Sequence, residues 1–248
     1  MKYELIEAET FPAAWEKALR RCWNEGVEVR TELEKEDDPP SLDLTAMIVV
    51  RNPMKEPRFH RAAFPMGAED LISYMDDFIS PLQSAEGPAD EDTYPNRIRS
   101  YQDNYEEGDP EAGVNQLEYL LEELKRDEAS KKAQAVLWNP RIDLEDHKTS
   151  PDLIRIWARI VQDRLNMNLY MCSNDLFKAN FSNMMAFFQL QKLLAEELDV
   201  EVGSYCHIAD SLHINGAYYD EVENTLAQLK DRDWEEKTWS SDELKKFQ

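Results

Sequence analysis

The sequence predicts an α+β domain in which a layer of helices covers one β-sheet. The clearest strand signal is the alternation of Leu165, Met167 and Leu169 with polar residues, which gives a strand one apolar face. Directly after it, residues 184–198 have the apolar spacing of a long helix. This combination favours a sheet with one helical layer. Further strands are expected at 44–50, 133–138, 155–161 and 200–208, and the first one spans 165–171.

Two helices are expected in the first third of the chain. Thr10 can cap a helix that has Pro12 in its first turn, and Gly26 stops it. The second helix spans 66–79, and Pro81 is expected to end it because proline lacks the amide hydrogen that a helix needs.

Two charged segments are expected to form loops. Residues 34–41 contain two adjacent prolines and precede the strand at 44–50. Residues 81–113 are poor in apolar periodicity and rich in Pro, Asp, Glu and Gly, which is typical of a functional loop or of disorder. A helix at 114–124 follows this segment.

The length of 248 residues fits a single domain, 1–248, with a polar C-terminal tail at 231–248. The three cysteines, Cys22, Cys172 and Cys206, form no CxxC pair, which argues against a disulfide scaffold. No apolar run of 18 residues and no signal-peptide pattern is seen, so a cytoplasmic protein without membrane contact is expected.

Acidic residues dominate the charge. The 51 Asp and Glu residues against 28 Lys and Arg residues give a formal charge of −23, which would repel a nucleic-acid backbone. The surplus fits a solvated acidic surface, as salt adaptation in a halophilic protein would produce, or a negative face for a partner. The acidic runs lack the spacing of a calcium loop, so no metal is expected.

Four short motifs resemble those of thymidylate synthase, in particular the shorter archaeal form. The first is LNMNLYMCSNDLFKANFSN at 165–183, read as a strand, two polar turns at 172–175 and 180–183, and the start of the helix. The others are DSLHING at 210–216, SKKAQAVLWNP at 130–140 and PDL at 151–153, in the family's order and spacing. The resemblance implies a thymidylate synthase-like fold, with a mixed, kinked sheet, helices on one side and a homodimer joined by its sheets back to back.

The family's reaction implies a set of site residues. A thiolate adds to C6 of the uracil ring, and C5 then attacks a methylene group carried by 5,10-methylenetetrahydrofolate. Arginines, two of them from the other subunit, hold the 5′-phosphate. An asparagine reads the pyrimidine edge, and a histidine and a tyrosine hold the ribose.

Several of these positions carry other residues here. The nucleophile's place in the motif is Asp152, and a carboxylate is a weak nucleophile toward C6. The phosphate-binding arginine is Cys172, the paired interface arginines are Lys131 and Lys132, and the ribose tyrosine is Asn215. The site has lost positive charge and gained a carboxylate, so a neutral or cationic ligand, or none, is favoured over a phosphate.

Other family positions are kept. Asn183 matches the pyrimidine-reading asparagine, and His213 matches the ribose histidine. The remaining matches are Ser173 beside the phosphate, Asp175 and Trp138 near the folate, and Tyr94 in the site wall. Asn183 and Asp175 can instead be explained as residues that cap the following helix. The glutamate that organises the family's water network is expected near Asp76 and Asp77.

Two cysteines and one histidine need a separate interpretation. Cys172 is about twenty positions along the chain from Asp152, so it is not expected to replace the missing thiol. Cys206 is interpreted as a core residue, because adjacent side chains of a strand, such as Cys206 and His207, point to opposite faces. His60 lies among charged residues and is expected at the surface.

Three functions remain open on this basis. The favoured one is a homodimeric pseudoenzyme that no longer makes thymidylate and serves as a binding, regulatory or assembly subunit, with a protein partner or an active paralogue. The second is an altered methyl- or hydroxymethyltransferase that acts at C5 of a pyrimidine nucleotide or nucleoside, with Asp152 as a base or cation binder and 5,10-methylenetetrahydrofolate as its cofactor. The third is residual synthase activity through water or a thiol.

Overall fold

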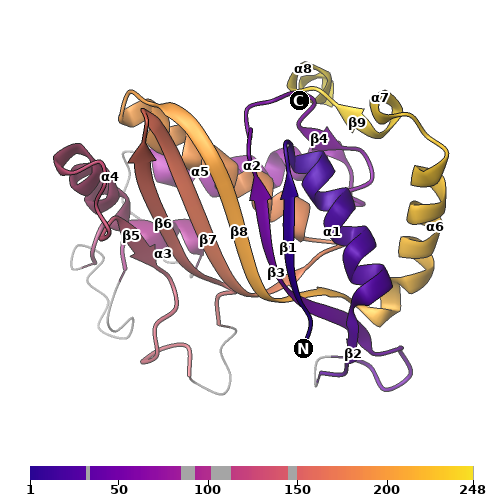
Figure 1. Cartoon of the computed structure of the whole chain (residues 1–248). Helices are drawn as coiled ribbons and strands as arrows, with labels where there is room; N and C mark the ends of the chain where they lie inside the picture. Colours follow the sequence, from indigo (N-terminus) through magenta and orange to yellow (C-terminus); the bar gives the residue numbers. More distant parts are fainter. Residues whose placement is uncertain (32–33, 85–92, 102–112, 145–149, 248) are drawn as a thin grey trace.

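The computed structural model describes residues 1–31, 34–84, 93–101, 113–144 and 150–247 (Figure 1). Its main feature is a mixed, 7-stranded sheet with the order β1-β3-β8-β7-β6-β5, in which β2 also pairs with β3. The strands are β1 (Tyr3–Ala8), β2 (Val27–Val29), β3 (Ser41–Val50), β5 (Gln134–Val136), β6 (Leu153–Val161), β7 (Arg164–Asp175) and β8 (Glu201–Ile214). The β1–β3 and β7–β8 pairs are parallel, and the other pairs are antiparallel.

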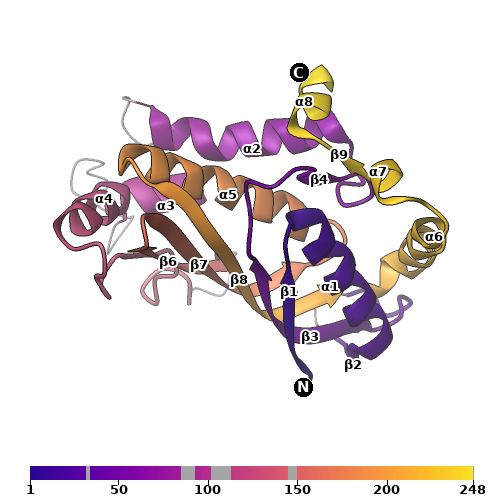
Figure 2. The same ribbon diagram turned by 45° about the horizontal axis from the view of Figure 1, so that its top comes forward.

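Helices cover one face of this sheet. Figures 1 and 2 show α5 lying on the sheet, α1 beside it and α2 outside α5. The helices are α1 (Phe11–Glu25), α2 (Ala68–Gln83), α3 (Tyr94–Arg99), α4 (Gln116–Arg126), α5 (Asn180–Glu197), α6 (Tyr219–Lys230), α7 (Trp234–Lys237) and α8 (Ser241–Leu244), with the short 3-10 helices η3 (Gly216–Tyr218) and η4 (Lys245–Phe247). The α+β fold with helices on one side of a mixed sheet is therefore confirmed.

The sheet register explains which strand residues face the helices. One row of cross-strand neighbours, all fully buried, joins Ile6, Ile48, His207, Leu169 and Ile156. The adjacent row joins Leu5, Met47, Ile208, Tyr170 and Arg155, and each of these side chains is partly or fully exposed. Alternation along each strand thus separates a core face from an open face.

Helix α5 is buried on most of its circumference because it lies between the sheet and α2. Phe187 and Leu190 are fully buried. Gln191, also fully buried, donates from Nε2 to the carbonyl oxygens of Leu165 and Ser204, at 2.8 and 3.0 Å. This one amide group ties the helix to both β7 and β8.

Three expected boundaries differ from the structure. β7 continues through 172–175, expected to form a turn, because Asp175 is still in register with His213 of β8. The residues 180–183 form the first turn of α5. Helix α2 passes Pro81 and ends at Gln83, since a proline in the last turn removes a single hydrogen bond.

The segment 81–113, expected to be a loop, contains α3. Thr93 caps this helix by accepting from the amide of Asn96, and Pro95 occupies its first turn. The parts of this segment at 85–92 and 102–112 lie outside the described residues.

Much of the C-terminal segment expected as a polar tail is packed against the domain. β9 (Thr238–Trp239) pairs with β4 (Phe59–His60) in a separate 2-stranded sheet. Arg61 lies over the Trp239 ring, 5.1 Å from its centroid, and Leu244 of α8 is buried. The apolar side chains of Trp239 and Leu244 hold this mostly charged segment against the domain.

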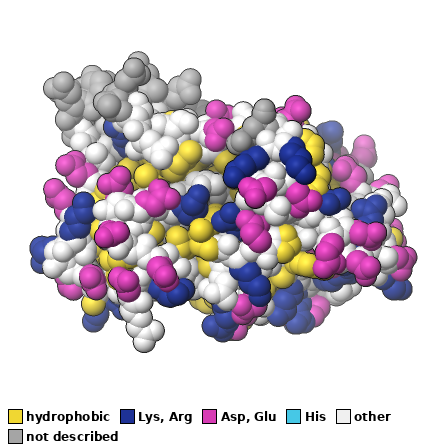
Figure 3. Space-filling view, turned by 90° about the horizontal axis from the view of Figure 1, so that it is seen from above, with side chains coloured by type: hydrophobic (Ala, Val, Ile, Leu, Met, Phe, Trp, Pro, Cys, Tyr) yellow, Lys and Arg dark blue, Asp and Glu magenta, His cyan; other side chains and the backbone are white. Residues whose placement is uncertain are grey.

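Two side chains outside the site were also assigned from the sequence. His60, expected at the surface, is fully buried against Trp15, with ring centroids 4.7 Å apart, and its Nε2 lies 3.4 Å from Glu16. Cys206 is buried, as expected. Acidic side chains alternate with lysines and arginines over the face seen in Figure 3. Within the described residues, none of the helices combines the length and apolarity needed to cross a membrane.

A buried ion pair holds α3 in place. The guanidinium group of Arg97 donates to both carboxylate oxygens of Asp143 at 2.7 Å, and both side chains are almost fully buried. Asp143→Asn is expected to lower the free energy of unfolding by about 3 kcal/mol, because it removes the negative charge of the carboxylate that binds the buried Arg97 guanidinium group through both oxygens. Urea denaturation measures this change in the free energy of unfolding. The control is Asp76→Asn at an exposed position, which should stay within about 0.5 kcal/mol of wild type. An equal effect of both variants would contradict the prediction.

His207 makes the core sensitive to acid. Burial lowers its pKa to about 4, and among the described residues its Nε2 atom has no hydrogen-bond partner. Because this folded-state pKa lies below the unfolded value of about 6.5, the stabilisation is complete above pH 6.5 and is lost as the pH falls toward 4. His207→Gln should reduce the stability difference between pH 7 and pH 5 by about 2 kcal/mol in urea denaturation. An unchanged difference would show that His207 does not titrate in this range.

Candidate functional site

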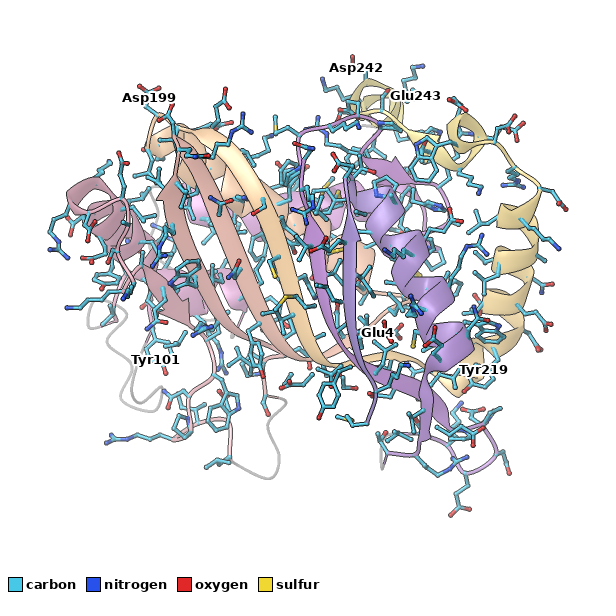
Figure 4. All side chains as sticks on the ribbon, viewed as in Figure 1. Glu4, Tyr101, Asp199, Tyr219, Asp242 and Glu243 are labelled. Atoms are coloured by element: carbon cyan, nitrogen blue, oxygen red, sulfur yellow. The ribbon has the colours of Figure 1, made fainter. Side chains whose placement is uncertain are left out.

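The polar site lies at one end of the sheet, where β7 and β8 finish and β3 and β6 begin. Asp43 of β3 is the cross-strand neighbour of His213 in β8, and His213 is in turn the neighbour of Asp175 in β7. Tyr219 marks this end of the molecule in Figure 4, and Asp199 marks the opposite end. Cross-strand neighbours are about 5 Å apart, so these three residues lie side by side across the strand ends.

Asp152 and Cys172 meet at this end because β6 and β7 are antiparallel. The amide of Cys172 donates to the carbonyl oxygen of Asp152 at 2.9 Å. Their side chains also touch, with the thiol of Cys172 3.8 Å from Oδ1 of Asp152. Strand pairing thus brings together two residues about twenty positions apart, so their separation along the chain does not by itself keep Cys172 away from the nucleophile position.

Burial raises the pKa values of both side chains, whereas their effects on each other have opposite signs. Partial burial raises the pKa of the Asp152 carboxyl, although the Cys172 thiol and the charge of His213 act in the opposite direction. The pKa of Cys172 is raised by burial and by the Asp152 charge. The thiol is therefore protonated at neutral pH and is a poor nucleophile, since thiolate is the reactive form.

Two tyrosines complete the wall around Asp152. Burial, with a smaller contribution from the Asp152 charge, raises the pKa of Tyr74 to about 12. The same two causes raise the pKa of Tyr94, whose hydroxyl group lies at the backbone of Asp152 and Leu153. Both phenols therefore remain protonated at neutral pH.

Tyr74 also connects Asp152 to Asn183. Its hydroxyl group donates to Oδ1 of Asn183 at 2.5 Å, across the contact between α2 and α5. Asn183 is only 7% exposed, and with Tyr74 and Ser182 it lines a depression of about 210 Å³. Asn183 is thus held by a side chain that lies within electrostatic reach of Asp152 and that the sequence analysis did not select.

Asp175 has a structural role. Its Oδ1 accepts from the amides of Phe177 and Lys178, at 3.0 and 2.9 Å, and its Oδ2 accepts from Asn215 at 2.8 Å. These contacts close the turn between β7 and α5. The carboxylate fits this capping role better than a contact with a folate, and Asn215 serves the same turn.

The remaining selected residues lie at different distances from this centre. Trp138 follows β5 and lies near the start of β6. The amide of the adjacent Leu137 donates to the carbonyl oxygen of Ile154, which fixes this position. Lys131 and Lys132 are exposed and precede β5. They lie about 20 Å along the sheet from Asp152, since the neighbouring Ala133 pairs with Ala158.

The expected glutamate position near Asp76 and Asp77 does not point into the site. Asp76 lines a separate depression with Arg58 and Lys192, and Asp77 accepts from Ser73 of the preceding turn. Tyr74, earlier on the same helix, is the residue of α2 that reaches Asn183. Because a helix has 3.6 residues per turn, the side chains of Tyr74 and Asp76, two positions apart, point to nearly opposite sides of α2.

Sequence reasoning also missed Asp43 and Ser211. Ser211 donates from Oγ to Oδ2 of Asp43, and its Oγ lies 3.3 Å from Nδ1 of His213. A signal was present, because Asp43 is the one charged residue in the run SLDLTAMIVV and is nevertheless buried. A charged residue in a buried position of a strand is uncommon and points to a site. Within the described part of the chain, no group of three or more His, Cys, Asp or Glu side chains could hold a metal ion.

Comparison with known proteins agrees with this architecture. The thymidylate synthase family model matches residues 76–244. A Methanosarcina mazei protein named "Putative thymidylate synthase" is 27% identical over 223 residues, which cover 90% of this chain and 94% of that protein. A Methanothermobacter marburgensis protein of the same name is 26% identical over 242 residues, 91% of this chain and 99% of that protein. The "Thymidylate synthase" of Bacillus licheniformis is 29% identical over 135 residues, which cover 54% of this chain and 47% of that protein.

The fold and site together define an α+β protein with a polar site at the ends of paired strands, closed by two tyrosines. The match of the family model to most of the chain makes the assignment specific. The chain belongs to the thymidylate synthase family.

The contact between Asp152 and Cys172 can be tested through thiol reactivity. Asp152→Asn removes the charge that raises the pKa of Cys172, so alkylation of Cys172 by iodoacetamide at pH 8 should become about threefold to tenfold faster. Peptide mass spectrometry measures the rate. Asp199→Asn, at the opposite end of the sheet, should leave it unchanged.

The other thiols provide an internal reference. Burial raises the pKa of Cys206 to about 11, and burial together with the Asp43 charge raises that of Cys22 to about 12, so both should stay unreactive in the folded protein. Equal alkylation rates at Cys172 in wild type and Asp152→Asn would show that the carboxylate does not control this thiol.

Proposed function

We propose that this family member does not methylate dUMP through a covalent thiol adduct and acts as a non-catalytic, pyrimidine-binding subunit. The observation that carries the proposal is the pair formed by Asp152 and Cys172. Asp152 stands where the resemblance places the nucleophile, and Cys172 stands where it places a phosphate-binding arginine.

The chemistry of the pair supports this proposal. A carboxylate is a weak nucleophile toward the C6 atom of uracil, and its negative charge lies where an electron-rich adduct would form. The thiol beside it is held protonated by burial and by that same charge. Neither group therefore supplies the activated nucleophile that the covalent route requires.

Retention of a binding role is supported by Asn183. Its carboxamide is held by Tyr74 and lies at a depression between α2 and α5. A buried amide in a fixed orientation can recognise the edge of a pyrimidine ring by hydrogen bonds. His213 lies within electrostatic reach of Asp152, and we assign it the contact with the sugar.

The open face of the sheet supports a homodimer. The row from Leu5 to Arg155 leaves Leu5 59% exposed and Met47 41% exposed, next to the half-buried Ile208. Exposed apolar residues on a broad, flat surface favour association. A back-to-back pairing of two such sheets would cover this row by a twofold contact.

The 3.8 Å contact favours one alternative function, an altered C5 transferase. There, Cys172 would add through Sγ to C6 of a pyrimidine, and Asp152 would accept the thiol proton. The alternative requires a one-carbon donor, for which the resemblance implies 5,10-methylenetetrahydrofolate. The capping role of Asp175 and the raised pKa of Cys172 make it the weaker candidate.

Intact-mass measurement separates the two functions. With 5-fluoro-dUMP and 5,10-methylenetetrahydrofolate, the wild-type protein should form no covalent adduct, and with dUMP it should yield no dTMP. The double exchange Asp152→Cys with Cys172→Arg restores a thiol beside a guanidinium group and should permit an adduct. Cys172→Arg alone is the matched control and should form none. Wild-type dTMP formation would contradict the proposal, and an adduct mapped to Cys172 would establish the alternative.

Calorimetric titration tests the binding role itself. Deoxyuridine should bind the wild-type protein, and Asn183→Ala should weaken this binding at least about tenfold, because a buried hydrogen-bonding group is lost. Ser73→Ala, at an exposed position of α2 that does not line this depression, should stay within about twofold of wild type. Equal affinities of the two variants would exclude Asn183 as the pyrimidine-reading residue.

A further inference from the structure

A second, larger depression lies beyond His213. Its volume is about 560 Å³, and its polar lining includes Glu34, Asp38, Asp43, Ser173, His213 and Asn215. We call it the acidic depression. His213 lines the acidic depression and also lies within electrostatic reach of Asp152, so the acidic depression adjoins the Asp152 part of the site.

Asp43 lines the acidic depression, and one of its carboxylate oxygens accepts no hydrogen bond from the described residues. The side chain is only 8% exposed, and its Oδ2 accepts from Ser211. Its Oδ1 is buried and has no hydrogen-bond partner among the described residues. A buried carboxylate oxygen without a donor is costly, which points to a ligand that supplies one.

The loop that brings Glu34 and Asp38 to this place is fixed by several contacts. Arg30 donates to the carbonyl oxygens of Lys35 and Asp38, at 3.0 and 2.6 Å, and Tyr219 donates to that of Pro40 at 2.5 Å. The loop also passes close to Gly216, where a Cβ atom would lie 1.9 Å from the carbonyl oxygen of Pro39. The acidic wall is thus built into the fold.

The charges of the lining residues favour a cation. Three carboxylates face the depression, and the cationic groups that line it are Lys35 and, when protonated, His213. A phosphate would place a double negative charge beside Asp43 and Glu34. An organic cation fits better than a metal ion, since no metal-binding group of side chains occurs in the described part of the chain.

We propose that the acidic depression binds a primary ammonium group of the ligand, with Oδ1 of Asp43 as its central acceptor. An ammonium group has three donors and no acceptor, so it matches the unused oxygen and the surrounding carboxylates. The ligand class is then a pyrimidine nucleoside that carries an amine at its sugar end. The pyrimidine part rests on the function proposed above, whereas the ammonium contact rests on the acidic depression alone.

Three compounds that differ only at the 5′ position test the proposal by calorimetric titration of the full chain at low salt. These are 5′-amino-2′,5′-dideoxyuridine, deoxyuridine and dUMP. The amine should bind at least about tenfold more tightly than deoxyuridine, and dUMP should bind most weakly. In Asp43→Asn, the affinities for the amine and for deoxyuridine should differ by no more than about twofold. The matched control Asp37→Asn should keep the preference for the amine seen in the wild-type protein. Asp37 is exposed, lies on the same loop and does not line the depression.

A diamine without a pyrimidine separates failure of this inference from failure of the proposed function. Putrescine should raise the melting temperature of the wild-type protein and of Asp37→Asn, but not that of Asp43→Asn. If putrescine has this effect and none of the three pyrimidine compounds binds, the ammonium site stands and the proposed pyrimidine binding fails. Binding of dUMP as tight as that of the amine would overturn the ammonium site. The absence of any difference between wild type and Asp43→Asn toward amines would also overturn it.

Discussion

The parallel pairing of β7 with β8, which α5 connects and covers, is the interaction on which the rest of the structure depends. It extends from Arg164 beside Glu201 to Asp175 beside His213. The first part of this pairing carries the apolar residues that α5 buries, and its last part carries the polar site. A shift of one residue would turn Leu165, Met167 and Leu169 away from the core. The geometry of the site is therefore a direct consequence of how the core packs.

At the polar end, the fold holds carboxylates in places where burial disfavours their charge. Burial raises the pKa values of both Asp43 and Asp152, and His213 offsets only part of this effect for each of them. Such an arrangement costs stability, and residues of this kind are typical of sites that bind a ligand. The side chains that line the site thus carry negative charge, whereas a phosphate site would need positive charge. The replacement residues Asp152 and Cys172 and the acidic depression all change the charge in this same direction. Both features indicate a changed ligand on a retained fold.

The sequence predicted which residues lie near one another better than it predicted their contacts. Asp152, Asn183, Ser173 and His213 do lie at one end of the sheet, and the order of the motifs was enough to select them. Tyr74 and Asp43 were missed, because one is an ordinary helix residue and the other lies in a strand that resembles none of the quoted motifs. Chain separation also misled the interpretation of Cys172, since an antiparallel pair brings together residues that are far apart in sequence.

By itself, the sequence determined the α+β class, the main strands and the long helix α5, the acidic charge and the resemblance to thymidylate synthase. These follow from local periodicity, composition and short motifs, which are properties of neighbouring residues. Only the tertiary structure decided that Cys172 touches Asp152, that Tyr74 holds Asn183, and that Asp43 faces a depression with a free oxygen atom. It also decided that 234–247 pack on the domain, through Trp239 and Leu244. The physical reason is that cross-strand register and helix packing act between segments distant in the chain, where no local pattern records them.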